Sequence, residues 1–181
     1  MFYRINIYNI VTDHLKTLRH TSSVNSKNIY WKDFILFFVI PVTIAGILTY
    51  MGYTLANKIN ELITAVSILG GFLFNLLAII YGQIDKIKGD TTRTTNDTDL
   101  QQVKKIFVKE IHINISFCIV LSIVILLALF LLQVDIPDFK YRYIINKLLI
   151  FISYFLLSIF LLSLLMVINR IYILLKKDSE Y

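Results

Sequence analysis

Six polar or small residues recur along one apolar stretch of the sequence, and their types and spacing suit a functional surface. They are separated by four, three, four, four and seven residues, which places them on one face of an α-helix. Polar side chains inside a membrane span cost about a kcal/mol or more each, so such a face is a place to look for function. A helix of this kind can line a pore, where water solvates its polar groups. The pore-lining candidates are Asn60, Thr64, Ser67, Gly71, Asn75 and Gly82.

The same stretch permits a second interpretation, in which the small residues serve helix packing. Gly70, Gly71 and Ser67 would let two helices approach closely, and Asn75 would join them by an interhelical hydrogen bond. The stripe extends across a whole bilayer, which packing alone does not require. Because four helices of one chain leave no room for a channel, the pore interpretation predicts a homo-oligomer with several copies of this helix around an axis.

Pro41 lies near the middle of the apolar run IPVTIAG. It removes a backbone hydrogen-bond donor, so it predicts a kink in this run. The kink is a candidate hinge for gating, and the loop expected after Tyr81 is a second place for movement. Proline is also common in membrane helices that have no such role.

The sequence contains no pattern that supports catalysis. Nothing resembles His-Glu-x-x-His, Gly-x-Ser-x-Gly, a glycine-rich phosphate loop or a pair of intramembrane carboxylates. His112 shares a helix face with Ser116 but has no second ligand at a metal spacing, and the single Cys118 cannot form an intrachain disulfide. Charged residues are absent from the expected spans, which argues against a secondary transporter. We therefore expect no enzyme activity, no cofactor and no bound metal.

The elements that must position these residues follow from composition and hydropathy. The chain has 181 residues, of which 57% are hydrophobic and 17% charged, and this excludes an ordinary soluble domain. Four apolar segments are each long enough to cross a hydrocarbon core of about 30 Å. We predict an all-α, polytopic membrane protein with a cytoplasmic segment at 1–32 and one four-helix domain at 33–181. The expected spans are residues 34–53, 62–81, 111–132 and 148–168.

Short connections join the first span to the second and the third to the fourth, so we expect each of these two pairs to pack tightly. Residues 100–109 are expected to extend the third helix into the cytoplasm. Lys and Arg near span ends resist translocation. With both termini inside, fourteen of them fall on the cytoplasmic side, and only four remain outside: Lys58, Lys140, Arg142 and Lys147.

Residues 2–18 have the pattern of an amphipathic helix, with Asp13 and Lys16 off the apolar face. Such a helix can lie on the inner membrane surface, or its apolar face can pack on a neighbouring subunit. The sequence does not choose between the two. The apolar positions at helical spacing are Ile7, Ile10, Val11, Leu15 and Leu18.

The predicted inner surface is basic. Most of this charge fits the positive-inside rule and contact with anionic lipids. A symmetric oligomer would multiply the charge around one axis and so form an electrostatic site for a nucleotide, an oligonucleotide or an acidic partner protein. Binding of duplex DNA is not expected. The candidate ligand-binding residues are Lys86, Lys88, Lys104, Lys105 and Lys109.

The chain is short, with four expected spans and both termini inside. Its second span and exit read SILGGFLFNLLAIIYGQIDKIK, and the approach to the third span reads KKIFVKEIHINIS. This architecture resembles the small membrane effectors of bacterial anti-phage systems, among them the membrane subunits of Hailong and Kiwa and the phage-exclusion protein RexB. The resemblance implies an oligomer, with a tetramer favoured, that stays closed in the inner membrane until infection. For a Hailong-like protein, the implied partner is a nucleotidyltransferase whose oligonucleotide product controls the channel.

Two functions from different classes follow. The first is a gated homo-oligomeric channel or pore that depolarises the inner membrane during anti-phage defence. The second is a non-conducting membrane scaffold or sensor whose cytoplasmic face recruits a soluble effector, in which case the polar stripe is only a packing surface.

Overall fold

The computed structural model describes residues 7–17, 35–53, 55–90, 98–134 and 142–179, without the side chains of residues 56, 83–90, 98–104 and 177–179. These residues form helices and no strand, as the all-α prediction requires. In chain order the elements are α1 (Ile7–Thr17), a π-helical turn η2 (Ile35–Val39), α3 (Ile40–Tyr50), a 3₁₀ turn η3 (Ala56–Lys58), α4 (Ile59–Asp90), α5 (Thr98–Gln133) and α6 (Arg142–Ser179).

Helices α4, α5 and α6 are long and apolar enough to cross a membrane, and they contain the predicted spans 62–81, 111–132 and 148–168. Their 32, 36 and 38 residues correspond to about 48, 54 and 57 Å at the usual helical rise. Each is longer than a hydrocarbon core of about 30 Å. These three helices indicate a multi-pass membrane protein.

The long helices also decide two predictions about their ends. Helix α5 begins at Thr98, which confirms that residues 100–109 extend the third span. The loop predicted after Tyr81 is wrong, because α4 continues to Asp90. Residues 82–88 contain no proline, and the cost of about 1 kcal/mol for the single Gly82 does not suffice to end the helix.

The first predicted span is shorter than expected. Its apolar helical stretch is Ile35–Tyr50, about 24 Å at the usual rise. Pro41 lies in the first turn of α3, directly after η2. Because proline has no N–H, the hydrogen-bond pattern changes from π to α beside the position of the predicted kink. At the other end, Gly52 adopts a φ of 74°, which lets the chain leave the helix.

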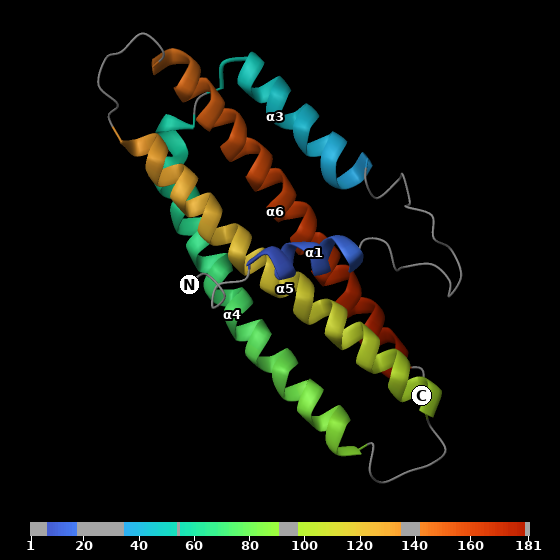
Figure 1. Cartoon of the computed structure of the whole chain (residues 1–181). Helices are drawn as coiled ribbons and strands as arrows, with labels where there is room; N and C mark the ends of the chain where they lie inside the picture. The colour runs from blue at the N-terminus through green and yellow to red at the C-terminus, as the bar shows by residue number, and fades with distance from the viewer. Residues whose placement is uncertain (1–6, 18–34, 54, 91–97, 135–141, 180–181) are drawn as a thin grey trace.

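The helices lie side by side in a row, in the order α4, α5, α6 and α3, and α1 lies across α5 and α6 (Figure 1). The expected pairing of the third span with the fourth is confirmed. The expected tight pair of the first and second spans is wrong, because α3 packs along α6 while α4 packs along α5. The exit of α3 is held on α6 by the hydroxyl of Tyr154, which donates to the carbonyl oxygen of Tyr53 at 3.4 Å.

Helix α5 packs between α4 and α6, and it contributes more buried apolar side chains than any other helix. It contributes the fully buried residues Ile111, Ile115, Cys118, Ile125 and Leu129. Helix α4 covers one side of this core with its own buried residues, Ile59, Val66, Leu73 and Ile80, together with Gly70.

Gly70 is a point of close approach between α4 and α5. A Cβ atom added at Gly70 would lie 3.2 Å from Oγ of Ser122 and 3.8 Å from its Cβ. The Ser122 hydroxyl donates to the carbonyl oxygen of Ile119 at 2.8 Å, so it cannot turn away without losing this bond. A Cβ at Gly71 would meet no atom within 4 Å. The glycine that allows helix packing within one chain is therefore Gly70, which is not on the polar stripe.

We expect Gly70→Ala to be less stable than Gly71→Ala by about 1–3 kcal/mol, the usual cost of overpacking. Both variants gain the same helix propensity, so their difference isolates the contact with Ser122. Unfolding free energies of the purified variants in mixed micelles would measure this difference. Adding Ser122→Ala should rescue Gly70→Ala, and equal stabilities of the two alanine variants would contradict the packing described above.

Candidate functional site

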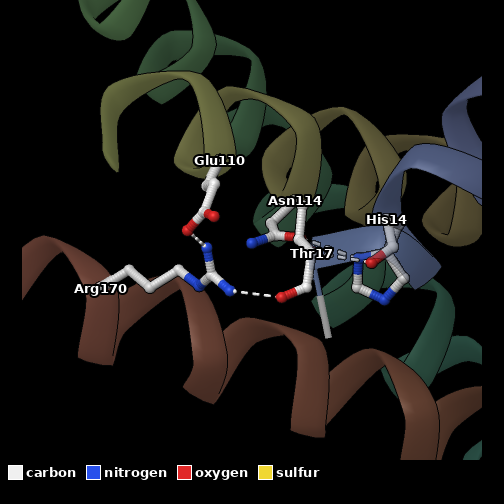
Figure 2. Close-up of polar contacts among 5 residues, drawn as sticks. All are labelled: His14, Thr17, Glu110, Asn114 and Arg170. Atoms are coloured by element: carbon white, nitrogen blue, oxygen red, sulfur yellow. Dashed lines mark hydrogen bonds and ion pairs between the residues drawn. The ribbon is translucent and has the colours of Figure 1, made fainter. Parts of the chain in front are cut away.

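A buried cluster of polar side chains lies where α1 crosses α5 and α6 (Figure 2). Its members come from three helices that are far apart in the sequence, and Figure 2 shows their polar atoms turned toward one another. The cluster consists of His14 and Thr17 from α1, Glu110 and Asn114 from α5, and Arg170 from α6.

Arg170 joins all three helices. Its side chain is only 7% exposed and forms an ion pair with Glu110 of α5 through Nη1. Its Nη2 donates to the carbonyl oxygen of Thr17 at 3.0 Å. Thr17 is the last residue of α1 that the structure describes, so this bond ties the guanidinium to the backbone of that helix. Arg170 therefore binds the backbone of α1 while Glu110 neutralises its buried charge.

His14 forms the apolar half of the same contact. The imidazole is buried and stacks on the ring of Phe117, with centroids 3.8 Å apart and planes 4° from parallel. The ring of Phe37 approaches it edge-on at 6.3 Å. The His14 Nδ1 atom lies 2.9 Å from Oδ1 of Asn114. One histidine thus contacts α5 and the turn that precedes α3.

The His14 ring is held in its neutral form. Burial lowers the pKa of His14 from 6.5 to about 4, the hydrogen bond to Asn114 acts in the opposite direction, and the positive charge of Arg170 lowers the pKa further. At neutral pH the imidazole is therefore uncharged, and one of its nitrogens donates while the other can only accept.

Asn114 is fully buried and its amide is incompletely used. The Thr17 hydroxyl lies 2.9 Å from Oδ1 of Asn114 and 2.7 Å from the carbonyl oxygen of His14, so its single hydrogen serves one acceptor at a time. The amide nitrogen Nδ2 has no partner, and Figure 2 shows it turned toward Arg170. Rotation of the amide by 180° would let Nδ2 donate to His14 and Thr17 and bring Oδ1 to the side of the guanidinium.

No local pattern in the sequence indicates this cluster. Arg170 is one of the fourteen basic residues expected on the cytoplasmic side, and the sequence predicts no role for His14. The predicted spans 111–132 and 148–168 exclude Glu110 and Arg170, yet both lie within the apolar segments Lys105–Gln133 and Arg142–Lys176 of the long helices. The available clue was His14 itself, a polar residue four and seven positions from the apolar Ile10 and Ile7.

The amphipathic helix predicted at residues 2–18 is present as α1 within the described residues. It packs on α5 of its own chain, which neither sequence interpretation considered. Its buried residues are His14 and Thr17, whereas Ile7 and Leu15 stay 44% and 39% exposed. Of the other apolar residues expected to bind a surface, Ile10 and Val11 are half-buried, and Leu18 lies outside the described residues.

The polar stripe of α4 is exposed along its whole length. At one end, Asn60 Oδ1 accepts a hydrogen bond of 2.7 Å from Gln133 of α5, and Thr64 donates to the Asn60 carbonyl oxygen. A Cβ atom added at Gly71 or Gly82 would meet no atom within 4 Å. The exposed residues are Asn60, Thr64, Ser67, Gly71, Asn75 and Gly82.

The predicted ligand-binding lysines come from the end of α4 and the beginning of α5. These two helix ends lie at the same end of the bundle (Figure 1). Lys105 and Lys109 are exposed on α5. The side chains of Lys86, Lys88 and Lys104 lie outside the described part of the chain. The candidate hinge, Pro41, is buried in the first turn of α3.

Comparisons with known proteins give no family for this chain. No protein-family model matches it. No curated protein matches it, and no solved structure matches it.

We expect Arg170→Met to lower the free energy of unfolding by about 3 kcal/mol, because it leaves the half-buried Glu110 carboxylate without its partner. Replacing both residues, Arg170→Met with Glu110→Leu, should recover most of this loss, since an apolar pair often substitutes for a buried ion pair at little cost. A double-mutant cycle on purified protein, unfolded in mixed micelles, measures the coupling. Additive losses would contradict the assigned ion pair.

Proposed function

We propose that the chain assembles into a homo-oligomeric gated channel of a bacterial inner membrane, with the polar stripe of α4 facing the pore. The observation that supports this most directly is the exposure of the stripe in the single chain. The residues of α4 that pack on α5 lie on another face of the helix.

The argument depends on what the stripe faces in a membrane. Thr64, Ser67 and Asn75 lie within Ile59–Gly82, a segment long and apolar enough to cross the bilayer. Facing lipid, the Ser67 hydroxyl and the Asn75 amide would lose their hydrogen bonds to water. A second copy of the chain or a water-filled lumen removes this cost, and only a lumen makes use of a stripe of this length.

The topology of the channel places both termini on the cytoplasmic side. The uneven distribution of Lys and Arg supports this orientation. So does the contact of α1 with Arg170, which keeps the N-terminal helix near the second half of α6. Helix α3 with η2 serves as the fourth crossing, and a local thinning of the bilayer accommodates its length at modest cost.

Gating is assigned to the cytoplasmic end of the bundle, where α4 ends and α5 begins. The lysines at the end of α4 and the beginning of α5 would gather around the axis of an oligomer and attract a polyanion such as an oligonucleotide. Pro41 and the π-helical turn beside it offer a position for movement. A tetrameric state and a role as an effector of anti-phage defence rest on the architectural resemblance to small membrane effectors.

A second candidate function is a non-conducting scaffold that recruits a cytoplasmic effector. The length of the helices favours this function, because all three long helices continue well beyond the predicted spans. Helix α4 continues to Asp90, α5 begins at Thr98, and α6 continues to Ser179. These extensions would form a helical platform on the inner side. In that case the stripe on α4 is an interface between copies.

Single-channel recording from the purified protein in a planar bilayer, with and without oligonucleotide, tests the channel. We expect discrete conductance steps, and a severalfold lower conductance for Asn75→Leu and Ser67→Leu with the oligomer intact. Phe72→Leu is the matched control, because Phe72 is exposed on α4 outside the stripe. A silent bilayer with verified insertion favours the scaffold, and loss of the oligomer in the leucine variants assigns the stripe to packing.

A further inference from the structure

The contacts that hold α1 on the bundle include a titratable side chain, which the proposed channel does not require. The helix is held on the bundle by two kinds of contact, Arg170 at the Thr17 carbonyl oxygen and the neutral ring of His14 between Phe117 and Phe37. Only the second kind depends on a group that titrates near physiological pH. We propose that α1 is a releasable latch across α5 and α6, and that a proton bound at His14 undocks it.

The surroundings of His14 do not accept a positive charge. Helix α5 contributes the neutral Asn114 and the ring of Phe117, and the turn before α3 contributes Phe37. Helix α6 contributes the positively charged Arg170, and the carboxylate of Glu110 in the cluster is already paired with it. On α1 itself, Asp13 binds Lys16 at 2.8 Å on the exposed side of the helix.

Protonation would therefore add a second buried cation beside Arg170. An imidazolium donates from both nitrogens, and the Asn114 oxygen can serve only one of them. Stacking on Phe117 favours a charged ring, but a cation–π contact is weaker than the cost of burying a charge. Once α1 leaves, its carbonyl oxygens and His14 are solvated by water, and the bridge from Arg170 to α1 is lost.

The expected pH range follows from the two states of the latch. In the undocked helix His14 titrates near its ordinary pKa of 6.5, and in the docked helix the pKa is about 4. Above pH 6.5 the ring is neutral in both states, so docking does not depend on pH. Between pH 6.5 and 4 the undocked state binds more protons, so the docking equilibrium constant falls about tenfold per pH unit and about 300-fold in all.

The latch can be observed as a distance within one chain. Spin labels at Tyr8→Cys in α1 and Lys105→Cys in α5 occupy exposed positions, and Cys118→Ala removes the natural thiol. Labelled protein in lipid nanodiscs, diluted with unlabelled protein, would be measured by double electron–electron resonance at pH 7.5, 5.5 and 4.5. We expect one narrow distance at pH 7.5 and a growing broad population at the lower values.

Variants of the cluster assign the effect to His14. His14→Gln should remove the pH dependence, whereas His112→Gln and His20→Gln, the latter outside the described residues, should retain it. Asn114→Asp supplies a carboxylate to the protonated ring, so it should keep α1 docked at pH 5.5. The proposal is overturned if the native distance does not change between pH 7.5 and 4.5, or if His14→Gln responds as the native protein does. If α1 is already undocked in His14→Gln at pH 7.5, that variant cannot report on the proton, and Asn114→Asp becomes the test. Undocking of α1 in Asn114→Asp at pH 5.5 would then overturn the proposal.

Discussion

The arrangement of α1, α5 and α6 depends on the burial of one arginine. A guanidinium inside an apolar bundle must have its charge neutralised and its donors occupied, because an unpaired buried charge costs several kcal/mol. Arg170 meets this requirement with a carboxylate from α5 and the carbonyl oxygen of Thr17 in α1. The same requirement that fixes α6 against α5 therefore fixes the position of an N-terminal helix that has no long apolar segment of its own.

The cluster also explains why α1 packs by a polar face. Most surface helices bury their most apolar residues, yet α1 buries His14 and Thr17 and leaves Leu15 partly exposed. Each buried polar group has a specific partner on α5 or α6, so the contact specifies one position and one register for the helix. The unpaired Nδ2 of Asn114 is the exception, and it makes the cluster sensitive to which tautomer His14 adopts.

Much of the helical content was predictable from local properties. Length and hydropathy were enough to place α4, α5 and α6, because a run of about 20 apolar residues is long enough to cross a bilayer by itself. The order of the helices in the row was not predictable from the sequence. The apolar faces of α3, α4 and α6 look alike in sequence, and which helices pack together depends on how their side chains fit. The spacing of Ser67, Gly71 and Asn75 placed them on one face, and the structure leaves that face exposed. His14 and Asn114 are 100 residues apart, so no local pattern connects them.

The row of helices has two unlike edges. One edge is α4 with its polar stripe, and the other is α3, whose exposed residues Val42, Ile44 and Ile47 are apolar. A contact between copies that uses both edges joins different surfaces and is heterologous. Such a contact repeats by rotation in one direction and closes as a cyclic ring when the angle permits, whereas a two-fold dimer would use one edge twice and leave the other to lipid.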